Sequence, residues 1–140
     1  DKAGQGYFYH LREIACDDVA AVNEGDEVKA EVIFAKGDRI KVTGVSKGKG
    51  NQGVIRRHHF AGNPGGHGSL IHRSTGSIGS SADPSKVIKG KRLPGHLGAR
   101  QVTTANLEVI DIKGEEHIIA VKGAVPGARG QIVILKKQGV

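Results

Sequence analysis

The stretch that decides the fold runs from residue 39 to residue 57 and reads RIKVTGVSKGKGNQGVIRR. It begins as a strand, because Arg39 to Thr43 alternates polar and apolar side chains as a strand with one buried face does. At Gly44 the pattern changes to glycines and cations, and no sustained strand or helix period returns before Arg100. The sequence therefore predicts a chain that leaves a small β-domain at Gly44 and rejoins it after Arg100.

Both flanks of this segment carry the pattern of short β-strands. Residues 28 to 34 are rich in β-forming side chains, and residues 36 to 38 predict a turn into the strand at 39–43. No amphipathic helix is predicted. Short strands joined by tight turns favour a small all-β barrel or sandwich. The other predicted elements are strands at 106–112, 117–122 and 131–136, a turn at 113–115 and a Gly/Pro-rich connection at 123–130.

We expect the chain to be organised in three parts. Residues 1–43 would form the first part of the β-body, and residues 101–140 its returning strands. Residues 44–100 would form a basic, glycine-rich extension. An irregular stretch of this length inside a small domain is normally functional or disordered.

The positive charge of the chain sits in that extension. The 140 residues include 21 Lys and Arg and 14 Asp and Glu, which gives a net charge of +7. Residues 44–100 hold ten of those cations and one acid, Asp83, while the remainder holds 11 cations and 13 acids. The same segment contains 13 of the 22 glycines and five of the seven histidines. This composition predicts a polyanionic partner, whose phosphates the cations neutralise while glycines permit close backbone approach.

The extension buries little apolar surface by itself, so we expect it to be mobile when free and ordered by RNA. A solvated basic linker is the alternative interpretation. The His, Phe and Ile side chains interspersed with the cations argue against a linker.

The predicted RNA-binding residues are the cations, imidazoles and aromatic ring of the extension. Lys and Arg would meet phosphates, whereas neutral imidazoles and Phe60 would hydrogen-bond to RNA or stack on it. The set is Lys47, Lys49, Arg56, Arg57, His58, His59, Phe60, His67, His72, Arg73, Lys86, Lys89, Lys91, Arg92, His96 and Arg100.

Several other classes of function are disfavoured by the sequence. The single cysteine, Cys16, supports neither a disulfide framework nor a Cys-based zinc site, and we interpret it as structural. No apolar run approaches the ~18 residues of a membrane helix, so no membrane partner is expected. Gly48 to Gly53 matches the dinucleotide fingerprint, but the long helix and the acid about 20 residues further on are missing.

Metal binding and catalysis are not expected either. His67 and His72 lie on a glycine-rich loop, and Asp83 is the only acid near them. Acid–base catalysis needs paired titratable groups, which one carboxylate cannot supply. We therefore predict no catalytic residue, no metal, no cofactor and no small-molecule substrate. A small enzyme with a basic substrate loop stays open as an alternative.

Residues 44 to 57 closely resemble the signature of the large-subunit ribosomal protein L3 family in its bacterial form. The likeness covers most of the chain and runs in order to near its end. The further matching blocks are HHF at 58–60, HGS at 67–69, HR at 72–73, GSIG at 76–79, KGKRLPG at 89–95, VT at 102–103, NLEV at 106–109 and KGAVPG at 122–127.

This resemblance implies a β-barrel body like that of the translation elongation-factor barrel domains, with an extension that threads 23S-type large-subunit rRNA. It implies a role in early subunit assembly, with ribosomal proteins L14 and L19 as neighbours. The loop tip would lie near the peptidyl transferase centre and comprises Gly76, Ser77, Ile78, Gly79 and Ser80.

The resemblance also implies a location in cytoplasmic ribosomes, with organellar ribosomes left open. Family members carry further residues ahead of the position of Asp1, so we expect the chain to be N-terminally incomplete. A non-ribosomal nucleic-acid-binding module is the alternative function, and it would bind isolated oligonucleotides on aromatic side chains.

Overall fold

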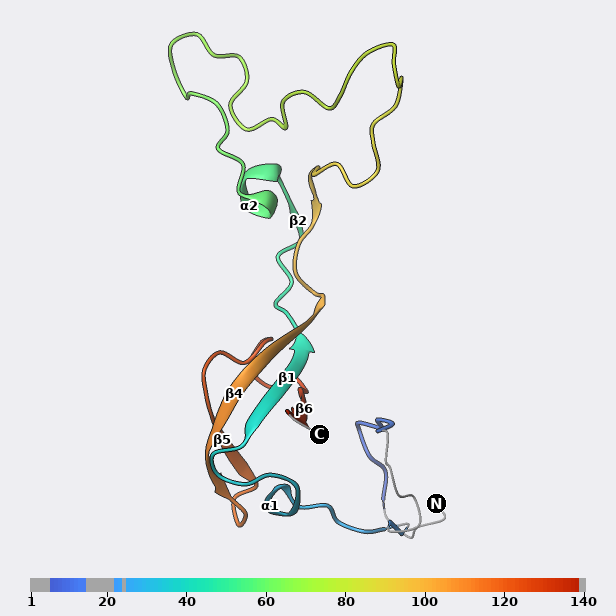
Figure 1. The fold of residues 1–140 in the computed structure, drawn as a ribbon, viewed down its shortest axis with the longest axis vertical. Coiled ribbons are helices and arrows are strands. Elements are labelled where there is room, and N and C mark those ends of the chain that lie inside the picture. Colours follow the sequence, from blue (N-terminus) through green and yellow to red (C-terminus); the bar gives the residue numbers. More distant parts are fainter. Residues whose placement is uncertain (1–5, 15–21, 24, 139–140) are drawn as a thin grey trace.

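A computed structural model describes residues 6–14, 22–23 and 25–138 of the chain (Figure 1). Cys16, which we interpreted as structural, lies outside these residues. Neither short helix of the described part has the length or apolar character needed to span a membrane. The elements in chain order are α1 (Ala30–Ile33), β1 (Arg39–Val45), β2 (Asn51–Gln52), α2 (Val54–His58), β3 (Gly95–His96), β4 (Gln101–Lys113), β5 (Ile118–Lys122) and β6 (Ile134–Lys137).

The fold is mainly β, as the sequence predicted. Four strands form one sheet in the order β5-β4-β1-β6, and every neighbouring pair is antiparallel. Strands β2 and β3 form a separate antiparallel pair. Within the described residues the four-stranded sheet is open, with β5 and β6 at its edges, so the predicted barrel is present there as a curved sheet rather than a closed ring.

One small apolar cluster holds the sheet together. Ile40 and Val42 of β1 are fully buried, and Val109 of β4 is nearly so, while the residues between them on β1 face outward. Phe34 enters the same cluster from the end of α1. Burying one branched side chain contributes about 1.5–3 kcal/mol. No member of this cluster belongs to residues 44–100, so the cluster stabilises the sheet and not the extension. The partly buried residues around it are Ile112, Ile119, Val121, Val133 and Leu135.

A β-bulge in β4 divides that strand into two functional halves. Ile40 pairs with Leu107 but Val42 pairs with Thr104, so β4 carries one extra residue at this point. Asn106 occupies the bulge with φ of 63°, and its Oδ1 accepts a 2.6 Å hydrogen bond from Arg39. Bulges increase local twist. The half of β4 after the bulge packs on the core, and the half before it leads into the extension.

The predicted strand at residues 28–34 is wrong, because these residues contain the one-turn helix α1. Phe34 N donates to Ala30 O over 2.9 Å and closes the turn. The β-forming side chains Val32 and Ile33 are exposed, and Phe34 alone enters the core. In the turn that follows, Gly37 N donates to Val109 O, and Val109 N donates to Asp38 O. A strand at 28–34 would need another strand to pair with its backbone groups, whereas a helical turn brings Phe34 to the core without one.

The remaining strand predictions agree with the structure apart from their ends. The strand predicted at 39–43 continues to Val45, and the strand predicted at 106–112 begins earlier, at Gln101. The last strand starts later than predicted, at Ile134, and the turn before β5 occupies 114–117. The turn predicted at 36–38 is confirmed, with Gly37 at φ of 89°.

Asp38 links this turn to the edge strand β6 through an ion pair. Its carboxylate accepts a 2.8 Å ion-pair contact from Lys137 Nζ and a 2.9 Å hydrogen bond from Ala35 N. The Lys137 hydrogen bond, reinforced by the Ala35 amide, lowers the pKa of Asp38. A lowered carboxyl pKa stabilises the fold above the unfolded-state pKa, and this contribution is lost as pH falls through the folded-state pKa.

We predict that Asp38→Asn lowers the melting temperature near neutral pH and that its difference from wild type shrinks below about pH 4, where an ordinary aspartate is protonated in unfolded chains. Thermal melts at several pH values would measure this. Asp111→Asn, at an exposed position of β4, is the matched control and should change little. An Asp38→Asn deficit that is the same at pH 3 and pH 7 would contradict the linkage.

Candidate nucleic-acid interface

The pairing of β1 with β4 continues beyond the sheet as a two-stranded ladder, here called the neck (residues 46–52 and 95–100). Ser46 N donates to Arg100 O over 2.9 Å, and Lys49 N donates to Leu97 O over 2.9 Å. The pair β2–β3 completes the ladder. Figure 1 shows the neck rising from one end of the sheet. The sequence predicted an irregular arm here, so both ends of the extension are more regular than predicted.

Gly98 is required where the arms of the neck meet, and Gly95 makes room for the side chain of Arg57. Gly98 has φ of 76°, and a Cβ at this position would clash with the carbonyl group of Lys47. A Cβ on Gly95 would lie 2.8 Å from a guanidinium nitrogen of Arg57. These glycines serve close packing within the protein, in addition to any approach to RNA.

Helix α2 fastens the top of the neck. Arg57 donates a 2.6 Å hydrogen bond to Leu93 O, and His58 Nε2 lies 3.1 Å from the same oxygen. Val54, at the start of α2, is only 1% exposed. The glycine-rich fingerprint at residues 48–53 thus does lead from a strand into a helix, but α2 has five residues. Arg57 and His58, both predicted to bind RNA, are half-buried and hold the second arm in place.

Residues 61–92, here called the distal loop, carry the rest of the extension. They form two lobes rather than one apex, visible as the green and yellow parts of the trace in Figure 1. The first lobe is closed at its base by Asn63 N, which donates to His72 O over 3.0 Å, and by His72 Nδ1, 2.8 Å from Pro64 O. Leu70, with 96% of its surface exposed, is typical of a segment without a core.

The cations of the extension have no carboxylate partners in the described part of the chain. Both ion pairs found there, Lys113–Glu116 and Lys137–Asp38, belong to the sheet. Thirteen of the sixteen predicted RNA-binding side chains are exposed, and the three half-buried ones are Arg57, His58 and Phe60. An exposed cation without an internal partner is available to an external anion, so the extension presents many such cations to solvent.

The histidines are spread along the extension instead of gathering. Among residues 6–14, 22–23 and 25–138, no three His, Cys, Asp or Glu side chains come close enough to hold a metal ion. The rings of His58 and Phe60 lie 6.1 Å apart at a tilt of 43°, beside the top of the neck. This geometry offers ring surfaces to a base but supplies no acid–base pair.

The sheet itself presents a basic pair that sequence reasoning missed. Lys41 and Lys136 lie directly opposite each other on β1 and β6, and both are exposed. Like charges placed directly opposite each other destabilise a sheet. The alternation of Arg39 to Thr43 indicated that Lys41 faces outward, but its partner could not be read from the sequence.

Residues 13–117 match the model of the family described as Ribosomal protein L3. The chain belongs to this family. The match covers the elements from α1 to the end of β4, including the neck and the distal loop, and it confirms the resemblance that the glycine-rich signature indicated.

Curated relatives agree with this assignment. The large ribosomal subunit protein uL3 of Syntrophotalea carbinolica is 48% identical over 136 residues, which is 97% of this chain and 65% of the relative. The uL3 protein of Geobacter sulfurreducens is 50% identical over 134 residues, covering 96% of this chain and 63% of the relative. The chain thus spans slightly less than two thirds of the length of these L3 family members.

The anchoring of α2 predicts a gradient of order along the extension. In the free protein, amides of the neck should exchange with solvent more slowly than amides of the distal loop, because the neck amides are paired across the ladder. Replacing Arg57 with Gln removes a charged hydrogen-bond donor to Leu93 O, so amide exchange at residues 95–97 should accelerate by about tenfold. Hydrogen–deuterium exchange resolved by residue would measure both effects.

Arg56→Gln is the matched control for this measurement. Arg56 lies on the same helix, is exposed, and reaches only Gln52 at 3.4 Å, so its loss should leave residues 95–97 unchanged. Equal acceleration in the two variants would show that general charge loss, and not the Leu93 contact, orders the neck.

Proposed function

We propose that this chain is a non-enzymatic structural constituent of the large ribosomal subunit that binds 23S-type rRNA through its extension. The observation that carries the proposal is the set of exposed cations, without carboxylate partners among the described residues, on a segment that stands off the sheet. Membership of the L3 family supports it, as does the name of its curated relatives, large ribosomal subunit protein uL3.

The parts of the molecule have different tasks in this proposal. The small core fixes the direction of β1 and β4, and the neck carries the basic surface away from the sheet. Lys and Arg side chains neutralise phosphates and release counterions, which gives affinity without base specificity. The distal loop orders only on RNA, because its own apolar contacts are too few to offset the entropy of ordering.

We further propose the setting that the resemblance implies. The chain would act early in subunit assembly, beside ribosomal proteins L14 and L19, in the cytoplasm of a bacterium. No cofactor, metal or small-molecule substrate enters this function. Its bacterial relatives support the location, and the absence of paired carboxylates on the extension supports a binding role instead of a catalytic one.

We predict that replacing Lys47, Lys49 and Arg56 together with Gln weakens binding to a large-subunit rRNA fragment. About 0.7 is lost from the log–log salt slope for each single-strand phosphate contact, so the slope should fall by about 2. Fluorescence anisotropy over a range of salt concentrations would give the slope. Arg57 is left out of this variant because it also holds Leu93.

The matched control replaces Lys36, Lys122 and Arg129 with Gln, which removes the same charge from exposed positions outside the extension. Its salt slope should stay near the wild-type value. If both triple variants lose the same slope, affinity comes from net charge and the extension is not the main RNA-binding element.

Residues 76–85, in the second lobe of the distal loop, carry no Lys or Arg and are suited to close packing instead of phosphate affinity. Ile78 to Ser81 line a shallow hollow of 240 Å³ together with Ser85, Lys86 and Val87. The hydroxyl of Ser85 donates to Ala82 O over 2.5 Å, and the lobe is exposed throughout. Small residues permit approach to folded RNA, and hydroxyl groups bond to 2′-OH groups or base edges. We propose that this lobe faces the peptidyl transferase centre.

We predict that Ser80→Trp leaves incorporation into subunits nearly intact but alters peptide-bond formation or sensitivity to inhibitors of that centre. Ser80 is preferable to Gly79, whose φ of 150° would add backbone strain to any side chain. Purified subunits with the variant at full occupancy would be assayed for both properties, with Ser80→Ala as the size-conserving control. Unchanged activity and unchanged inhibitor sensitivity in Ser80→Trp would mean that the lobe is a passive turn.

A further inference from the structure

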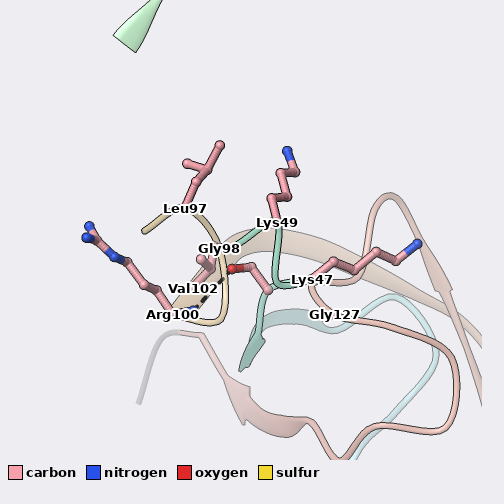
Figure 2. A pocket seen from close by; sticks show the side chains of 8 residues that line it. Lys47, Lys49, Leu97, Gly98, Arg100, Val102 and Gly127 are labelled. Carbon is pink, nitrogen blue, oxygen red and sulfur yellow. Dashed lines mark hydrogen bonds between the residues drawn. The ribbon is translucent and has the colours of Figure 1, made fainter. Parts of the chain in front are cut away.

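An open groove of about 460 Å³ lies where the neck joins the sheet (Figure 2). Three separate stretches of the chain build it: the first arm of the neck, the second arm with the start of β4, and the connection between β5 and β6. Its lining includes Lys47, Lys49, Leu97, Arg100, Val102 and Gly127. Each of the three cations is predicted from the sequence to bind RNA, but only the fold brings them to one groove.

The lining of the groove is largely apolar. Leu97 and Val102 contribute aliphatic side chains, and Gly98 and Gly127 contribute backbone without side chains. Val102 is 42% exposed although it lies on β4, directly opposite Gly44. An apolar surface of this kind does not serve a phosphate, which needs donors, but it suits the flat face of a nucleobase.

The cations surround the groove but do not converge on one point. In Figure 2, Lys47 and Arg100 extend to opposite sides, and Lys49 points away from the sheet beside Leu97. A single small anion would be held by cations that point toward one another. Cations that diverge around an apolar surface instead match a strand that enters on one side and leaves on the other, with a phosphate at each step.

The segments that line the groove are positioned by the protein's own hydrogen bonds. Ser46 Oγ accepts from Arg100 N at 3.3 Å, and Ser46 N donates to Arg100 O at 2.9 Å, so the two arms are tied at this level. Gln131 Oε1 accepts from Ala128 N over 3.1 Å and fixes the connection that carries Gly127. A site formed before binding loses less entropy when it takes up its ligand.

We propose that this groove holds one unstacked nucleotide of a continuous RNA strand, with its base against Leu97 and Val102 and its flanking phosphates on Lys47, Lys49 and Arg100. This inference rests on the proposed function, because it requires that the extension binds RNA. A groove of this kind would let the protein distinguish a duplex with a bulged nucleotide from a fully paired duplex, which phosphate contacts alone do not allow.

The test compares two RNA hairpins that differ only in one bulged nucleotide in the stem. The bulged nucleotide carries 2-aminopurine, a fluorescent analogue of adenine, as the reporter. Wild-type protein should bind the bulged hairpin about five- to tenfold more tightly, the low end of what base stacking supplies. Val102→Phe fills the groove without changing charge, so it should bring this ratio to near one while the affinity for the paired hairpin stays the same.

Ile110→Phe is the matched control, because Ile110 lies on the same strand outside the groove and is 41% exposed. It should keep the wild-type ratio. Excess AMP should not displace the bulged hairpin, since a free nucleotide lacks the second flanking phosphate.

Each remaining outcome overturns the proposal in a distinguishable way. Equal affinity of the wild type for both hairpins would contradict the nucleotide site in the groove. An unchanged ratio of bulged to paired affinity in Val102→Phe would contradict it too, and neither result would contradict the proposed function. Displacement by AMP would show a free-nucleotide site in place of a strand site. Binding to neither hairpin would count against the proposed function and the groove alike.

Discussion

The antiparallel pairing of β1 with β4 is the interaction on which the rest of the structure depends. Inside the sheet it brings Ile40 and Val42 against Leu107 and Val109, which form most of the small core. Beyond the sheet the same pairing continues as the neck, from Ser46–Arg100 to β2–β3. One ladder therefore supplies both the stability of the body and the direction of the extension.

The extension has to combine a high density of positive charge with a defined position, and these requirements conflict. Cations without partners repel one another, and the segment buries little apolar surface. Two features position the extension. Backbone hydrogen bonds in the neck do not depend on side-chain burial, and Arg57, one of the cations, donates an internal hydrogen bond to Leu93 O. The distal loop has single backbone hydrogen bonds, such as Asn63 N to His72 O, but no paired ladder, so we expect an external partner to order it.

Glycine has two separate roles in this molecule. Gly98 allows the arms of the neck to cross at a distance that no side chain permits, and Gly95 makes room for the guanidinium group of Arg57. In the distal loop several glycines, such as Gly65 and Gly66, have no other atom within 4 Å of the position that a Cβ would occupy, so protein packing does not require them. Their small size leaves the backbone open to close approach from outside the chain.

The sequence by itself determined the mainly β class, the strands at 39–43 and 106–112, the limits of the basic segment and the family. These properties are local or compositional, since alternation within a few residues and the charge of a segment do not depend on distant contacts. Only the tertiary structure decided that the arms pair, that Arg57 fastens α2 to Leu93, and that residues 28–34 contain a helical turn. Ser46 and Arg100 are 54 residues apart, and Arg57 and Leu93 are 36 apart. A local sequence pattern cannot predict contacts between residues this far apart. These contacts depend on how backbone and side chains pack once the sheet has brought the two arms together.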